Sequence, residues 1–193
     1  DRVKLINIKR ESLVFGYVGT ISPIEGLDLL INAFHNLHSK SFSNKLIIYG
    51  DGIECSNLKK ISQNNPLIEF KGRFNQAQIA DIYSTIDVVI NPRVSNYLTN
   101  SVTPLKPLEA MAYKKLVLVS NVEGMKELIE HNKTGYIFQS DSVKEIEEIV
   151  FNILSSNNYH HIIEAAYEYI QSDRNWRINA KIYQKIYNQL INV

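Results

Sequence analysis

The feature that most constrains the fold of this chain is an alternation of short apolar runs, rich in β-branched residues, with amphipathic helical stretches. Runs that are apolar on both faces are typical of strands in a parallel sheet, because helices cover both sides of such a sheet. The alternation therefore predicts an α/β protein. The expected strands are residues 13–18, 45–49, 67–71, 87–91, 116–120 and 135–139.

Parallel crossover connections are almost always right-handed, which reduces this alternation to one architecture. We predict a doubly wound, Rossmann-like parallel sheet of about six strands, with helices on both faces and a helical C-terminal tail. The helices expected between the strands are 27–38, 56–63, 76–85, 107–113, 124–130 and 142–155.

The tail from Asn158 onward has only helical patterns, at 159–171 and 176–191. Apolar residues in its last stretch recur at spacings of three and four, which is typical of one helix face. We expect residues 158–193 to pack on a domain formed by residues 13–157.

Composition narrows the possible functions. The 193 residues carry 21 Lys and Arg against 20 Asp and Glu, a net charge of +1, so nothing favours a nucleic acid as partner. One cysteine excludes an intramolecular disulfide framework and a cysteine-rich zinc site. No apolar run approaches the roughly 20 residues of a membrane span, and no signal-peptide pattern opens the chain. We expect a cytoplasmic domain.

In open parallel sheets, ligands bind beyond the carboxyl ends of the strands. Five of the eight glycines lie in the loops expected there, where they allow a backbone to approach a ligand closely: Gly19, Gly50, Gly52, Gly72 and Gly124. The first of these loops leads into a helix, whose free amides and dipole favour a phosphate. Neither a Walker motif nor a dinucleotide-binding GxGxxG motif is present.

The segment with most candidate ligand groups follows the fourth expected strand. The Thr103 hydroxyl and the free amides near Leu105 are suited to an anion. Glu109, in the first turn of a helix, either accepts two hydrogen bonds from a vicinal diol or only compensates the helix dipole. Arg93 and Lys106 either neutralise a diphosphate or are solvated surface cations.

Seven different short motifs follow one another along the chain, at residues 15–19, 25–33, 47–52, 70–73, 83–88, 107–112 and 122–129. Over about residues 13–190 this ordered set resembles the family 4 retaining glycosyltransferases, which are GT-B enzymes. The resemblance implies a carboxyl-terminal domain that binds a nucleotide-diphosphate sugar, usually without a metal. It also implies that the amino-terminal acceptor domain is missing, that residues 1–12 end the inter-domain linker, and that this fragment alone is inactive. Attachment to the inner membrane face would come through the missing half.

The resemblance also assigns roles to single positions. Glu109 matches the residue that binds the donor ribose, Gly19 and Thr20 the loop that faces the diphosphate, and 72–74 the segment that meets the base. Leu105 and Lys106 lie where the family binds the sugar and the distal phosphate. The donor-binding residues expected are Gly19, Thr20, Gly50, Gly72, Arg73, Phe74, Thr103, Leu105 and Glu109.

Three positions depart from the family pattern. Thr20 and Glu25 stand where Arg and Lys are usual, and Ser101 stands where a second glutamate is usual. Our hypothesis is that Arg93 and Lys106 supply the lost positive charge and stabilise the leaving diphosphate. No histidine pair is accompanied by a cysteine or carboxylate cluster, so we expect neither a metal site nor another cofactor.

Two alternatives remain open. The departures at positions 20, 25 and 101 favour a non-catalytic or degenerate nucleotide-sugar-binding domain. A Rossmann-like interaction module without a small ligand is the other. The apolar stripe of the final helix, which in GT-B proteins crosses to the amino-terminal half, is expected to cause self-association where that half is absent.

Overall fold

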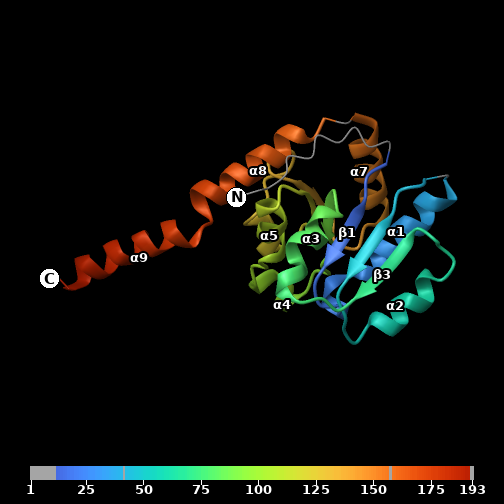
Figure 1. Cartoon of the computed structure of the whole chain (residues 1–193), viewed down its shortest axis with the longest axis horizontal. Helices are drawn as coiled ribbons and strands as arrows, with labels where there is room; N and C mark the ends of the chain where they lie inside the picture. The colour runs from blue at the N-terminus through green and yellow to red at the C-terminus, as the bar shows by residue number, and fades with distance from the viewer. Residues whose placement is uncertain (1–11, 41, 157, 192–193) are drawn as a thin grey trace.

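The protein contains a six-stranded sheet in which all strands are parallel, with the order β3-β2-β1-β4-β5-β6. The computed structural model describes residues 12–40, 42–156 and 158–191 (Figure 1). This strand order confirms the doubly wound fold predicted from the alternating pattern. The strands are β1 (Phe15–Val18), β2 (Leu46–Tyr49), β3 (Ile68–Gly72), β4 (Val88–Asn91), β5 (Leu116–Ser120) and β6 (Tyr136–Phe138).

One face of the sheet is covered by α1 (Leu27–Ser39), α2 (Cys55–Ser62) and α7 (Val143–Ser156). Alternate residues of each strand point into this layer, because side chains of a strand alternate between its faces. Phe15 of β1 meets Phe34 of α1 edge to face, with ring centroids 5.5 Å apart.

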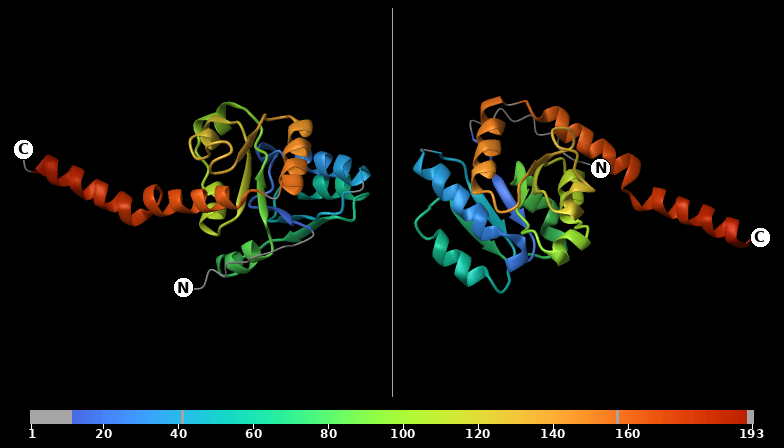
Figure 2. Two further views of the ribbon diagram at one scale, coloured as in Figure 1. Left: turned by 90° about the horizontal axis from the view of Figure 1, so that it is seen from above. Right: turned by 180° about the vertical axis from the view of Figure 1, so that it is seen from behind.

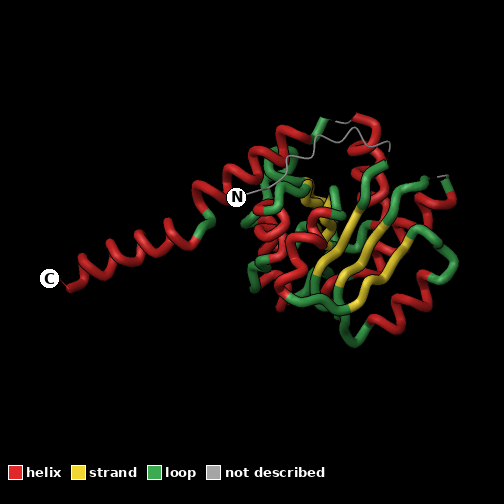
Figure 3. Tube along the Cα trace, viewed as in Figure 1, coloured by secondary structure: helices red, strands yellow, loops and turns green. Residues whose placement is uncertain are grey.

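The opposite face is covered by α3 (Ile79–Ser84), α5 (Lys106–Ala112), α6 (Glu123–Lys126) and α8 (His160–Asp173). The β5 residues that face away from α1, such as Val117, pack into this second layer. Both faces of the central strands are therefore buried, which explains why these strands read as continuous apolar runs. Figure 3 shows the strands between the two helical layers.

Short elements occupy the edge where the strands end. The arrows of β1 and β3 in Figure 1 point towards this edge, where α2 and α4 (Tyr97–Ser101) lie. The sequence pattern predicts no helix in the segment of α4. It forms a helical turn because Asn96 caps it: the Asn96 side chain accepts from the Thr99 amide, and the Thr99 hydroxyl accepts from the Asn96 amide. The 3-10 turns η1 (Pro23–Glu25) and η2 (Gln76–Gln78) precede α1 and α3.

The rim glycines allow the loops at this edge to pack closely. A Cβ on Gly50 would lie 1.8 Å from the Gly19 carbonyl oxygen, and one on Gly52 would lie 2.0 Å from that of Ile21. The loops after β1 and β2 therefore pack against each other, which requires glycine. At Gly72, with φ of 76°, a Cβ would have no atom within 4 Å, so the open position is the one after β3.

The two C-terminal helices differ in their packing. In α8, Ile162, Ala166 and Ile170 are buried against the domain. In α9 (Trp176–Ile191) no residue is buried, and Figures 1 and 2 show this helix extending away from the sheet. The expectation that 158–193 packs on the domain therefore fails for α9, because its apolar face meets no surface of this domain. Apart from Ser12, the expected linker end at 1–12 lies outside the described residues.

Two further observations concern the described residues, 12–40, 42–156 and 158–191. Over these ranges, no helix has the length and apolar character that crossing a membrane requires. They also hold no group of three or more His, Cys, Asp or Glu side chains arranged to bind a metal ion.

Candidate functional site

A buried polar cluster lies at the carboxyl ends of β1 and β4, the adjacent strands from which the chain winds in opposite directions. Open α/β sheets bind ligands at this point, where their loops diverge. The cluster consists of Tyr17 at the end of β1, Glu25 of η1, Arg93 after β4 and Lys106 at the start of α5. Two regions distant in sequence, residues 17–25 and 93–106, thus supply one anionic, two cationic and one phenolic group.

Lys106 is held by contacts from the loop after β1. Its Nζ lies 2.8 Å from Oε2 of Glu25 and donates a hydrogen bond of 2.8 Å to the Tyr17 hydroxyl. The same ammonium group lies 4.9 Å from the centroid of the Tyr17 ring. A Cβ on Gly19 would lie 2.6 Å from Lys106 Cε, so a side chain here would displace the lysine from its present path across the loop. The structure therefore brings together two residues expected to face a diphosphate.

Arg93 approaches the same carboxylate from the other side. Its NH2 lies 3.6 Å from Oε1 of Glu25, and its side chain is 11% exposed. The Nε and NH1 atoms are buried and have no hydrogen-bond partner among the described residues. Buried guanidinium donors without an acceptor carry a desolvation cost, which an anion bound beside them would remove.

Burial shifts the pKa values of Lys106 and Tyr17 in opposite directions. Burial lowers the pKa of the Lys106 ammonium group below its usual range, while the Glu25 carboxylate opposes that shift. Burial, followed by the Glu25 carboxylate, raises the pKa of the Tyr17 phenol, so this hydroxyl remains protonated and donates to the Thr20 carbonyl at 2.6 Å. With Glu25 ionised, the two cations leave one unit of positive charge.

Glu109 lies in the first turn of α5, on the same edge of the sheet. Its Oε2 accepts a hydrogen bond of 3.1 Å from the hydroxyl of Tyr83 in α3. The hydrogen bond from Tyr83 restrains this carboxylate, and Glu109 is only partly buried. This fits a group that accepts hydrogen bonds from a diol.

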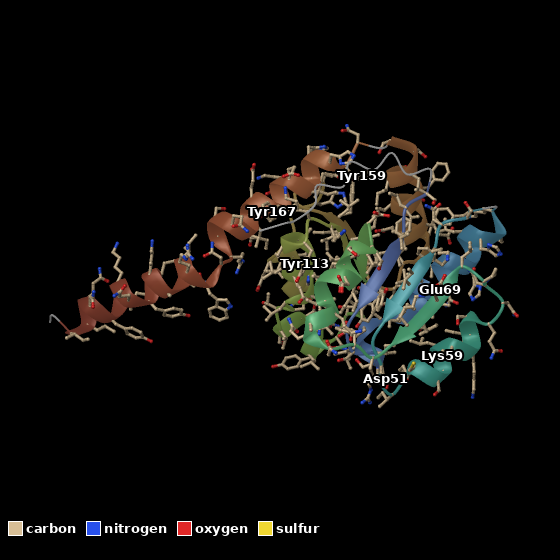
Figure 4. All side chains as sticks on the ribbon, viewed as in Figure 1. Asp51, Lys59, Glu69, Tyr113, Tyr159 and Tyr167 are labelled. Carbon is tan, nitrogen blue, oxygen red and sulfur yellow. The ribbon has the colours of Figure 1, made fainter. Side chains whose placement is uncertain are left out.

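The other expected residues are spread along the rim. The Thr103 hydroxyl donates to Glu127, so its proton is not available to an anion. Leu105 is 71% exposed, Thr20 is exposed, and Phe74 is half-buried. Arg73 is exposed and forms a 2.8 Å ion pair with Asp51, labelled at the lower edge of Figure 4.

Sequence reasoning missed three residues of this site. Glu25 was treated as a lost lysine, although it is the counter-ion of both cations. Tyr17 and Tyr83 are not among the expected site residues, although each hydroxyl makes a polar contact at the rim. The one signal for Tyr17 was its place directly before the Gly19 loop; no local pattern indicated that Tyr83 reaches Glu109.

The sequence of this chain is matched by a known family. The family model described as Glycosyl transferases group 1 matches residues 3–169. The chain belongs to this family. This group 1 glycosyltransferase chain is 26% identical over 191 residues to the lipopolysaccharide 1,2-N-acetylglucosaminetransferase of Salmonella typhimurium, covering 93% of this chain and 49% of that protein. The family predicted from the ordered motifs is thereby confirmed.

Solved structures show the same fold, one of them in another group 1 glycosyltransferase. The C-terminal domain of such a protein from Francisella tularensis has a TM-score of 0.74 at 20% identity, covering 85% of this chain and 87% of that domain. Anabaena HepE in complex with UDP has a TM-score of 0.71 at 20% identity, covering 95% of this chain and 50% of HepE. The chain spans about half the length of the curated relatives it matches.

Proposed function

We propose that this chain binds the nucleotide-diphosphate sugar donor of a retaining glycosyltransferase in bacterial polysaccharide or glycoconjugate synthesis. One observation carries the proposal: Lys106 and Arg93 converge beside Gly19 where β1 and β4 end. The lipopolysaccharide enzyme of Salmonella and the UDP complex of HepE support the substrate class.

In this proposal the cations act on the leaving group. The bond between C1 of the sugar and the diphosphate oxygen breaks, and the diphosphate leaves with the electron pair. Lys106 and Arg93 stabilise the charge that develops there, which is where fixed charges lower a barrier most. The acceptor hydroxyl attacks on the leaving-group face, which retains the configuration, and its proton passes to the departing diphosphate. No metal ion takes part in this scheme.

The rest of the donor extends along the rim in the same proposal. Glu109 accepts hydrogen bonds from the ribose, and the backbone at Gly72 meets the base, where the structure is open. Leu105 and the amides beside it contact the sugar. Thr103 contributes through its backbone, since its hydroxyl is bonded to Glu127.

We further propose that an amino-terminal acceptor domain covers the apolar face of α9. Relatives about twice as long as this chain support such a second half. The exposed residues of that face need a partner: Trp176, Ile182, Tyr183, Ile186, Tyr187, Leu190 and Ile191. Without the acceptor domain the chain does not complete sugar transfer. The working location is the cytoplasm, with contact to the inner membrane face through that half.

Nucleoside diphosphates test this function directly. We expect UDP, ADP, GDP or CDP at millimolar concentration to raise the melting temperature, because a ligand of the folded state stabilises it by mass action. Lys106→Met should weaken the best of these ligands by about tenfold or more, since a charge-assisted contact is lost. Lys40→Met is the matched control, because Lys40 forms an ion pair with Glu147 away from the site. If none of the four ligands binds, the proposal is wrong.

One observation favours a second candidate, a degenerate nucleotide-sugar-binding domain without transfer activity. Glu25 already occupies both cations, and Ser101 stands where the family usually has a second glutamate. Under this reading Glu25 competes with the diphosphate for both cations, so Glu25→Gln binds the nucleoside diphosphate more tightly than the wild type does. Equal or weaker binding by Glu25→Gln decides for the first candidate.

A further inference from the structure

A buried tyrosine from one helix contacts the candidate ribose-binding carboxylate of another. Tyr83 of α3 is 1% exposed, and its hydroxyl lies 3.1 Å from Oε2 of Glu109 in α5. Both helices pack on the same face of the sheet, although the two residues are 26 positions apart in the sequence. The donor-binding scheme gives Tyr83 no part.

The Tyr83 ring is fixed by stacking on a second tyrosine and by burial in the core. It stacks on Tyr113, which is labelled in Figure 4, with centroids 4.7 Å apart and planes inclined by 14°. Ile79 and Ile82 of the same helix are buried with it in the second core layer. Burial, followed by the Glu109 carboxylate, raises the pKa of the Tyr83 phenol above its usual range, so the hydroxyl stays a donor.

We infer that Tyr83 is the positioning residue for ribose recognition, holding one oxygen of Glu109 so that the other faces the two ribose hydroxyls. A glutamate without such a support loses side-chain freedom when it binds, and that loss opposes binding. Because Tyr83 holds Oε2, the Glu109 side chain is already ordered in the free protein, and less of its freedom is lost on binding. The inference rests on the proposed donor function, because it concerns how the same site selects a ribonucleotide.

The test compares ribonucleotides with analogues that lack both ribose hydroxyls. The tightest of UDP, ADP, GDP and CDP and its 2′,3′-dideoxy counterpart are titrated calorimetrically into the full chain. We expect the wild type to prefer the ribonucleotide by about tenfold or more, as for hydrogen bonds to a charged group. Tyr83→Phe should reduce this preference by about threefold to tenfold and leave the dideoxy affinity unchanged.

Two controls separate positioning from a loss of packing. Tyr113→Phe removes a hydroxyl from the other ring of the stack, and we expect it to keep the wild-type preference. Glu109→Ala should abolish the preference, and adding Tyr83→Phe to it should change nothing more. Melting curves establish that each variant is folded.

The outcomes distinguish this inference from the proposed function. If the wild type binds none of the nucleotides, the donor function fails and the inference fails with it. If the wild type prefers the ribonucleotide and Tyr83→Phe keeps that preference, only the inference is overturned. A loss of preference in Tyr113→Phe as large as in Tyr83→Phe also overturns it, since stacking rather than the hydroxyl would then position Glu109.

Discussion

Glu25 and Lys106 form a buried ion pair, with 2.8 Å between Oε2 and Nζ, that joins the loop after β1 to the first residue of α5. The side chain of Glu25 is 6% exposed and that of Lys106 is 24% exposed. The carboxylate also lies 3.6 Å from Arg93, so one acid holds two cations at the edge of the sheet. The pair therefore links the stability of the domain to the charge of its candidate donor site.

The first prediction concerns stability. Glu25→Gln leaves two partly buried cations without a counter-ion, and we expect it to lower the free energy of unfolding by about 3 kcal/mol. Denaturant titration measures this change. Glu130→Gln, which breaks an exposed ion pair with Lys133, should cost less than about 1 kcal/mol. Equal effects of the two substitutions would contradict the prediction.

A double-mutant cycle then tests whether Lys106 is the coupled partner. Glu25→Gln with Lys106→Met removes both charges of the pair and should cost less than the sum of the single substitutions. The expected coupling is about 1–2 kcal/mol, as for residues in direct contact. Additive costs would show that Glu25 stabilises the fold through Arg93 instead.

The third prediction concerns pH. Burial holds the pKa of Lys106 below the usual range of a lysine, and only the ammonium form attracts a diphosphate. Nucleoside diphosphate affinity should therefore fall as the pH rises through this lowered pKa. The groups that face Lys106 are Glu25 and Tyr17 from the β1 side and Arg93 from the β4 side. Calorimetry between pH 7 and 10 measures the profile.

Two variants test whether Lys106 is the titrating group and in which direction Glu25 shifts its pKa. Lys106→Arg stays charged throughout the range, so its profile should lack the alkaline fall caused by Lys106. Glu25→Gln removes the charge that opposes the shift, so its fall should come at a lower pH than in the wild type. The same profile for wild type and Lys106→Arg would exclude Lys106 as the titrating group.

The fourth prediction concerns the rim glycines. Gly50→Ala adds a methyl group 1.8 Å from the Gly19 carbonyl oxygen at a positive φ, so the loops after β1 and β2 must separate. We expect a loss of about 3 kcal/mol or more in unfolding free energy. Gly72→Ala meets no atom within 4 Å and should cost only the backbone strain, about 1–2 kcal/mol. Thermal and denaturant unfolding compare the two, and the reverse order would contradict the packing of these loops.

The fifth prediction concerns α9. Its exposed apolar face should cause the isolated chain to self-associate, and Ile186→Asp with Leu190→Asp should abolish association. Since α9 buries no residue, the melting temperature of the domain should stay unchanged. Gln184→Asp with Asn188→Asp, which keeps the spacing on the other side of the helix, is the matched control. Sedimentation velocity measures the state, and a monomeric wild type at high concentration would contradict the prediction.

The amino-acid sequence by itself determined the strands, the longer helices and the sheet. Apolar runs such as 116–120 can be buried on both sides only between two layers of helices, and the crossover rule then leaves one doubly wound arrangement. The sequence also indicated that Arg93, Lys106 and Glu109 belong to one edge, because each follows the end of a strand. These conclusions depend only on the order and spacing of neighbouring residues, which can be read directly from the sequence.

Tertiary structure alone decided which groups meet. Tyr17 and Lys106 are 89 residues apart, and their contact depends on how the loops after β1 and β4 fold over the edge. The pairing of Glu25 with both cations and of Tyr83 with Glu109 has the same origin, as does the lack of any buried residue in α9. Charge pairing and burial depend on distances in space, and a periodic pattern fixes only which face of an element is apolar, not what lies opposite that face.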